Sequence, residues 1–218
     1  NLIINGAMQV AQRGTSSTTS GYGSVDRFFN EYSGTDEAST QAQVDVASGT
    51  TPYTKGFRKA LKITNGNQTS GAGATDAVAL QYIFEGQDIN GSGWDYTSAS
   101  SFVTLSFWIK SSVAQTFYLR FRMSGSSVTK EFISAVNATT SWQKITKTIP
   151  GATGVDSVNT NATGGFILLS LFRGTDNTGS INLDQWNTFN QSIIFPDHAS
   201  TWYTTNDATL EITGVQLE

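Results

Sequence analysis

The chain has 218 residues, of which 14% are charged, and it carries a formal net charge of −4 with a single His and no Cys. Without Cys it has no disulfide framework, thiolate zinc site or Cys nucleophile, and one His excludes a multi-His metal site. The acidic balance argues against nucleic-acid binding, which needs clustered Lys and Arg. No apolar run approaches about 18 residues, so we expect no membrane insertion. These exclusions leave a polar domain whose expected role is binding a ligand or a partner.

Short runs of strand-forming residues dominate the sequence. Val, Ile, Phe, Thr and Tyr gather between clusters of Gly, Asn, Ser and Asp, and Ser plus Thr make up about a quarter of the chain. We expect strands near residues 7–12, 26–32, 40–47, 58–64, 77–85, 102–110, 115–123, 128–136, 142–149, 165–172 and 208–217. This series predicts an all-β fold, a two-sheet antiparallel β-sandwich of jelly-roll type. We expect residues 1–218 to form a single module of a longer chain.

Two mid-chain segments show the clearest alternation, residues 102–110 and 115–123. One face of each is apolar, and the residues on those faces are Val103, Leu105, Phe107 and Ile109, then Phe117, Leu119, Phe121 and Met123. The connection between the two segments is short, which predicts a hairpin. We expect both apolar faces to lie against the core between the sheets.

The opposite faces of these two segments predict a glycan-binding surface. If the segments pair, Trp108, Tyr118, Arg120 and Arg122 share one face, and two side chains of residues 77–85, Gln81 and Glu85, join it. Trp and Tyr offer flat platforms for a pyranose ring, while Arg and Gln pair with vicinal hydroxyls. The alternative is that Trp108 belongs to the core and that the Arg side chains are solvated or ion-paired.

Two glycine-containing segments carry further signals. Residues 165–172 are apolar on both faces, which is typical of a strand covered on both sides. Gly214 interrupts the alternation of the last segment, which predicts a bulge.

Several large aromatic residues lie in or beside polar loops, and they are a second candidate site. The most suggestive is the Gly93-Trp94-Asp95-Tyr96 segment, where two rings flank an acid; the others are Tyr22, Tyr53, Trp186, Trp202 and Tyr203. An exposed Trp there would be a binding hot spot. The alternative is a loop anchor that packs into the edge of the sandwich.

We expect no enzymatic activity. Glycoside hydrolysis needs two carboxyl groups at a fixed separation, and the candidate pairs are Glu85 with Asp88 and Asp176 with Asp184. Since the chain has 17 acidic residues, close pairs arise by chance. The single His198 reads as a loop residue that is exposed or hydrogen-bonded, and it supports no serine triad.

Several short stretches, spread over the whole chain, resemble the sequence of a known family. The opening NLIINGAMQVAQRGT with the later Asp26-Arg27-Phe28 resembles a module of bacteriophage tail-fibre and other virion structural proteins. Similar stretches follow at Glu85-Gly86-Gln87-Asp88, VTLSFWIK, Ser141-Trp142-Gln143-Lys144 and the closing LEITGVQLE. The resemblance implies a non-catalytic, structural module that binds cell-surface glycans, sits in the virion after synthesis in the bacterial cytoplasm, and forms a homotrimer.

The same pattern is similar to jelly-roll carbohydrate-binding modules, which gives an alternative: a module excised from an extracellular polysaccharide-degrading enzyme. Such modules often hold a structural calcium near an acidic residue that follows the Asn-Gly of the first strand. Here Gln9 stands at that position, and a neutral amide is a poorer ligand for a hard cation. A calcium ion held by backbone carbonyls near Asn5 and a distant Asp stays open.

Overall fold

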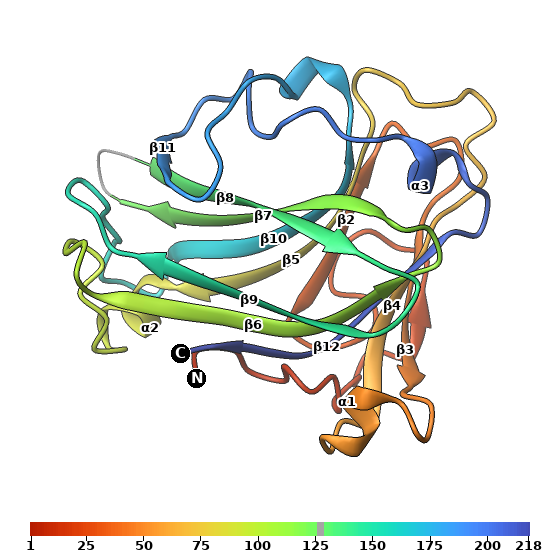
Figure 1. Ribbon diagram of the computed structural model, residues 1–218, viewed down its shortest axis with the longest axis horizontal. Helices are drawn as coiled ribbons and strands as arrows, with labels where there is room; N and C mark the ends of the chain where they lie inside the picture. The colour runs from red at the N-terminus through yellow and green to blue at the C-terminus, as the bar shows by residue number, and fades with distance from the viewer. Residues whose placement is uncertain (126–128) are drawn as a thin grey trace.

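Two six-stranded antiparallel sheets make up most of the computed structural model, which describes residues 1–125 and 129–218. The first sheet, sheet A, runs in the order β1 (Ser16–Ser17), β3 (Thr40–Asp45), β4 (Lys59–Thr64), β12 (Thr209–Leu217), β6 (Phe102–Ser111) and β9 (Gln143–Pro150). Sheet B runs in the order β11 (Trp186–Thr188), β8 (Thr129–Ala138), β7 (Gln115–Ser124), β10 (Thr163–Arg173), β5 (Ala77–Glu85) and β2 (Phe28–Ser33). The sheets face one another (Figure 1), which confirms the all-β jelly-roll sandwich.

In the part of the chain that the structure describes, helical structure is confined to short turns. These are α1 (Thr51–Thr54), α2 (Gly86–Asn90), α3 (Thr201–Thr204) and a 3₁₀ turn at Thr175–Asn177. Within residues 1–125 and 129–218, no helix is long and apolar enough to cross a membrane.

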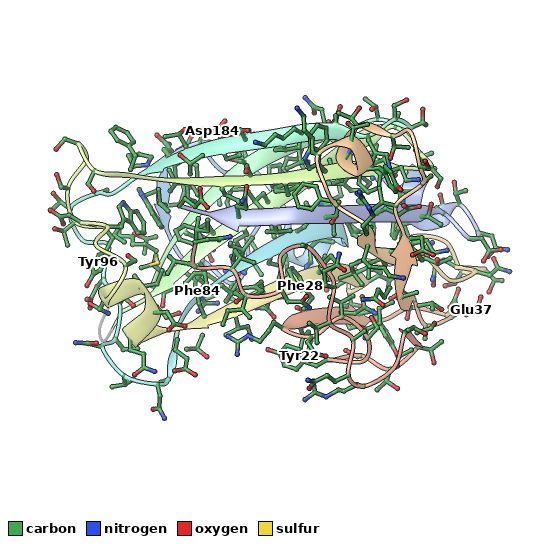
Figure 2. All side chains as sticks on the ribbon, turned by 90° about the horizontal axis from the view of Figure 1, so that it is seen from below. Tyr22, Phe28, Glu37, Phe84, Tyr96 and Asp184 are labelled. Carbon is green, nitrogen blue, oxygen red and sulfur yellow. The ribbon has the colours of Figure 1, made fainter. Side chains whose placement is uncertain are left out.

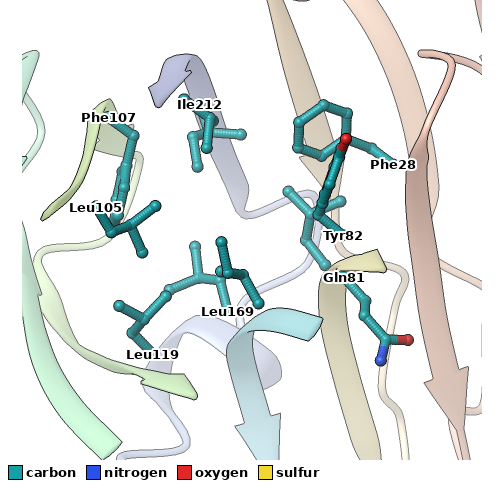
Figure 3. A pocket seen from close by; sticks show the side chains of 11 residues that line it. Phe28, Gln81, Tyr82, Leu105, Phe107, Leu119, Leu169 and Ile212 are labelled. Atoms are coloured by element: carbon teal, nitrogen blue, oxygen red, sulfur yellow. The ribbon is translucent and has the colours of Figure 1, made fainter. Parts of the chain in front are cut away.

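The core between the sheets is built from the alternating faces that the sequence predicts. From β6 it takes Val103, Leu105, Phe107 and Ile109, and from β7 it takes Phe117, Leu119, Phe121 and Met123, all buried. A void of about 20 Å³ lies inside this core. Figure 3 shows side chains that line it, Leu105 and Phe107 of sheet A and Leu119 and Leu169 of sheet B. An apolar void of this size is a packing defect rather than a ligand site.

Strand β10 is covered on both faces, as its sequence predicts. Ile167, Leu169 and Leu171 join the core between the sheets, while Phe166 and Leu168 join a second apolar cluster on the outer face of sheet B. The bulge predicted at Gly214 is also confirmed: the β12–β6 register shifts between Thr213 and Gln216, and Gly214 has a φ of 62°.

The hairpin expected between residues 102–110 and 115–123 is wrong. Strand β6 pairs with β9 and β12 in sheet A, whereas β7 pairs with β8 and β10 in sheet B. The connection crosses the edge of the sandwich, and its backbone N–H groups bond elsewhere: Ser111 donates to Thr139 and Ser112 donates to Thr209. The short loop is therefore a corner between two sheets.

Residues 7–12 form no strand, which corrects a second expectation. Asn5 and Met8 have φ values of 60° and 59°, and the Asn5 amide bonds both the N–H and the carbonyl of Val10. The Asn5 side chain thus bonds the Val10 N–H and carbonyl, which a neighbouring strand would otherwise bond. The sequence also gave no sign of the short strands β1 and β11. For the strand expected near 128–136, residue 128 lies outside the described residues.

Candidate functional site

The sandwich separates the side chains that the sequence placed on one glycan-binding face. Trp108 lies on the outer face of sheet A, between Lys144 and Thr213, because β6 belongs to that sheet. Tyr118 and Arg122 lie on the outer face of sheet B with Arg120. Trp108 therefore shares no surface with the other three, which corrects the shared face that depended on the hairpin.

Residues 178–198, the covering segment, include the edge strand β11 and otherwise lie over part of the outer face of sheet B (Figure 1, blue). Ile194 and Phe195 are buried against sheet residues, and Ile181 and Phe189 pack at the margin of the same cluster; the sheet residues are Ala79, Ile133, Phe166 and Leu168. The covering segment thus fills the space over β7, β8 and β10 that a ligand bound to this face would need.

Arg120 forms a buried ion pair beneath the covering segment. Its Nε and Nη2 atoms lie 2.8 and 2.6 Å from Glu131 Oε2, and Arg120 is 5% exposed. Burial lowers the pKa of Arg120 to about 10 and raises the pKa of Glu131, and the opposite charge of the partner offsets part of each shift. Their pairing is the alternative that the sequence left open for the Arg side chains.

Arg122 and Tyr118 are also held by the covering segment. The Arg122 guanidinium lies 4.3 Å from the ring centre of Phe189, and burial lowers the pKa of Arg122. Tyr118 packs edge-on against His198, with ring centres 4.9 Å apart. Burial lowers the pKa of His198 to about 4, so the ring is neutral near pH 7. These contacts make the covered face a packed layer rather than an open binding surface.

Trp94 and Tyr96 form a loop anchor with a partly open side. Trp94 is 9% exposed and packs on Phe121 with ring centres 5.9 Å apart, and Tyr96 meets Trp94 edge-on at 6.0 Å. Trp94 also lines a hollow of about 310 Å³ beside Phe102, which is 57% exposed. Of the two alternatives, the burial of Trp94 supports the anchor.

Gln81 and Glu85 are half-buried on the outer face of sheet B, on strand β5. Figure 3 shows the Gln81 amide directed away from the core. The first residue of β2, Phe28, pairs with Tyr82, so β5 continues through Ile83, Phe84 and Glu85 without β2 beside it. This free edge is one wall of a cleft.

The cleft has a volume of about 330 Å³ and is lined by Arg13, Tyr22, Arg27, Ile83, Phe84, Glu85, Asn161 and Thr163. Tyr22 is 37% exposed and projects from the lower rim of the molecule in Figure 2, beside the strand that carries Phe28. Its ring packs edge-on against Phe29, with ring centres 5.2 Å apart. An aromatic ring, two guanidinium groups, a carboxylate, an amide and a hydroxyl thus meet around one opening, which we name the edge cleft.

Sequence reasoning singled out Glu85 and Tyr22 but gave neither Arg13 nor Arg27 a role in binding. The available signal was the Asp26-Arg27-Phe28 step, at the point where β2 begins. Arg13 lies in a polar loop with no periodic pattern, and only the tertiary fold brings it to residues 83–85.

The residues near Asn5 do not fit a calcium ion. Asn5 Nδ2 donates to the carbonyls of Val10 and Asp26 at 2.9 and 3.0 Å, while Asn5 Oδ1 accepts from the Val10 N–H, which fixes the orientation of the amide. A hydrogen-bond donor therefore faces the two carbonyls that would coordinate a cation. In the described part of the chain, no three acidic, His or Cys side chains gather as a metal site.

Glu85 and Asp88, the first carboxyl pair considered for hydrolysis, form a capping box at the start of α2, in which each carboxylate accepts from the backbone N–H of the other residue. Glu85 Oε2 accepts from Gln87, and Asp88 Oδ2 accepts from the Glu85 N–H. Asp184 bonds Ser134 and lies 3.7 Å from Lys147.

Comparisons with known proteins find similarity of fold. No family model matches the chain, and no curated protein matches its sequence. The enzymatically active domain of tailspike protein 4 from bacteriophage CBA120 matches with a TM-score of 0.50 and 9% identity, over 100% of this chain and 21% of that one. The shared feature is the β-sandwich.

Two further solved structures match along most of the chain. A family 11 carbohydrate-binding module from Clostridium thermocellum, in complex with a mixed-linked β-1,3-1,4 tetrasaccharide, has a TM-score of 0.43 and 10% identity, covering 93% of this chain and 95% of that one. The N-terminal cellulose-binding domain of β-1,4-glucanase C from Cellulomonas fimi has a TM-score of 0.42 and 15% identity, covering 96% and 97%.

Proposed function

We propose that the chain is a non-catalytic glycan-binding module and that the edge cleft is its binding site. The observation that carries this proposal is the half-exposed Tyr22 ring at a cleft that also holds charged, amide and hydroxyl groups. A fixed ring offers a stacking platform to the C–H face of a sugar, and the polar groups pair with its hydroxyls. The 330 Å³ volume suits one or two sugar units.

The test is binding of the purified chain to a glycan array, followed by affinity electrophoresis in gels that contain the polysaccharides found. We expect binding to at least one glycan, and a loss of affinity of about tenfold for Tyr22→Ala, since an aromatic contact contributes about 1 kcal/mol or more. Trp108→Ala, on the outer face of sheet A, is the matched aromatic control and leaves affinity unchanged.

Two outcomes would contradict the proposal. If Trp108→Ala abolishes binding and Tyr22→Ala does not, the site lies on sheet A and not at the edge cleft. If the chain binds no glycan on the array and none in the gels, it is not a glycan-binding module.

We further propose that the module belongs to a phage tail or tail-fibre-like protein, where it is displayed as a homotrimer on the virion. The sequence resemblance supports this proposal, and a tailspike is among the proteins with a similar fold. Light scattering of the purified chain tests the oligomer, with an expected mass three times 23.4 kDa. A monomer contradicts the trimer, and a polysaccharide-degrading catalytic domain in the same gene product contradicts the tail assignment in favour of an enzyme's binding module.

A further inference from the structure

Two arginines at the edge cleft have no acidic partner among the residues that the structure describes. Neither Arg13 nor Arg27 forms an ion pair within residues 1–125 and 129–218, although the cleft also contains Glu85. Glu85 Oε2 is taken by the Gln87 amide at 2.6 Å, where α2 begins. The nearby Asp26 Oδ1 accepts from the Gln12 N–H at 3.0 Å. One oxygen of each nearby carboxylate thus bonds another group, neither carboxylate pairs with Arg13 or Arg27 in the described residues, and the two guanidinium groups remain to meet a ligand.

Arg27 is held at the cleft by a strained but well-bonded turn. Its φ of 75° is unusual for a residue with a side chain and has a conformational cost that the surroundings must offset. The surroundings do so through neighbours: the Asp26 N–H donates to Val10, and the Asp26 carbonyl accepts from Asn5. The Arg27 guanidinium lies 5.7 Å from the ring centre of Tyr82. Strain fixed in place around a cation is typical of a binding position.

Arg13 lies next to the stacking platform. Its guanidinium carbon is 6.0 Å from the ring centre of Tyr22, and Arg13 itself is exposed. The ring is held from behind by Phe29, and two backbone hydrogen bonds between Gly21 and Asn30, of 2.8 and 3.1 Å, fasten the loop to β2. The platform is therefore positioned before a ligand arrives, and Arg13 lies beside it.

We propose that the edge cleft recognises an acidic sugar, a uronate unit whose carboxylate meets the guanidinium groups of Arg13 and Arg27. This inference rests on the proposed glycan-binding function and names its ligand class. The planar guanidinium fork matches a carboxylate in two parallel hydrogen bonds, which a hydroxyl cannot reproduce. The pyranose ring then stacks on Tyr22, and the exposed Asn161 and Thr163 face the sugar hydroxyls.

The experiment compares matched polysaccharides by isothermal titration calorimetry and affinity electrophoresis. Polygalacturonate and alginate are set against their carboxyl-reduced forms, which keep the sugar backbone but lose the charge. Dextran sulfate and dextran separate a carboxylate from a sulfate group. The variants are Arg13→Gln, Arg27→Gln and Arg27→Lys, and the control is Arg58→Gln, which changes net charge equally but stacks on Tyr53 outside the cleft.

We expect at least one uronate polymer to bind about tenfold or more tightly than its reduced form, and we expect Arg13→Gln and Arg27→Gln each to lose about tenfold in affinity. Arg27→Lys keeps the charge but loses the fork, so it binds more weakly than the native chain. Arg58→Gln binds as the native chain does. Circular dichroism of each variant establishes that it is folded.

The possible outcomes distinguish failure of the acidic-sugar inference from failure of the proposed glycan-binding function. Equal binding of a uronate polymer and its reduced form, with Tyr22→Ala still impaired, overturns the acidic-sugar inference and leaves the glycan-binding function. Tighter binding of dextran sulfate than of both uronate polymers, or an equal loss of affinity with Arg58→Gln, would mean that the arginines attract polyanions in general. Either result also overturns the acidic-sugar inference. Failure to bind any polysaccharide, neutral or acidic, overturns both.

Discussion

The Arg120 guanidinium and the Glu131 carboxylate are joined through two nitrogen–oxygen contacts of 2.8 and 2.6 Å beneath the covering segment. Glu131 is completely buried, and the rings of Phe166, Phe189 and Phe195 lie within 6.0 Å of the guanidinium carbon. The charge pair thus lies within an apolar layer on the outer face of sheet B, where either charge alone would be uncompensated.

Removing one partner of this pair destabilises the fold. Glu131→Gln leaves Arg120 as an uncompensated buried charge, and we expect the free energy of unfolding to fall by about 3 kcal/mol in urea denaturation at pH 7. The matched control is Asp45→Asn, which breaks the exposed pair with Lys59 and costs less than about 1 kcal/mol.

Replacing both partners by apolar residues reverses most of the loss. The double variant Arg120→Met with Glu131→Leu removes both desolvation costs, and we expect it to be at least about 2 kcal/mol more stable than Glu131→Gln. A double variant no more stable than the single one would mean that the pair is needed for packing and not for charge compensation.

The half-buried His198 makes stability depend on pH. Since burial lowers its folded pKa to about 4 from 6.5, the folded state disfavours the proton, and its contribution is complete above pH 6.5 and lost as pH falls toward 4. Between pH 7.5 and 5 we expect His198 to account for about 2 kcal/mol of lost stability. Denaturation curves of the native chain and His198→Gln at both pH values measure it, and equal losses in the two proteins would contradict it.

Tyr203 supports a buried carboxylate through its hydroxyl. It donates to Asp76 Oδ2 at 3.0 Å, and burial, with the Asp76 hydrogen bond, raises the pKa of Tyr203, so the hydroxyl stays protonated. Tyr203→Phe keeps the stacking on Phe172 but leaves Asp76 short of a donor, and we expect a loss of about 1–2 kcal/mol in thermal unfolding. Tyr32→Phe removes an exposed hydrogen bond to Thr18 and should change stability by less than about 0.5 kcal/mol.

Gly86 sits where a side chain has no space. A Cβ atom there would lie 1.7 Å from the Val158 carbonyl oxygen, so Gly86→Ala must displace the backbone at the start of α2. We expect a loss of about 2 kcal/mol or more in urea denaturation. At Gly179 the same atom would meet Ile193 at an ordinary 3.5 Å, and Gly179→Ala should stay within about 0.5 kcal/mol. Equal effects of the two substitutions would show that the close approach at Gly86 relaxes freely.

The sequence by itself determined most of the longer strands and which of their faces are apolar, but not the turn at residues 7–12 or the short strands β1 and β11. The alternation from Val103 to Ile109 and from Phe117 to Met123 predicts the inner faces, and the apolar run of β10 predicts a strand covered on both sides. These features are local, because side chains alternate across a strand whatever strand lies next to it.

Only the tertiary structure decided which strands are neighbours and which side chains meet. It placed Trp108 on one sheet and Tyr118 on the other, and it brought the covering segment over Arg120. It also gathered Arg13 and Arg27 with Glu85 at one edge. Strand partners are selected by hydrogen bonds and packing between residues that lie far apart in the chain. Loop length alone does not reveal them, because the corner at Ser112–Ala114 is as short as a hairpin turn. Periodicity therefore specifies the faces, and long-range packing specifies the site.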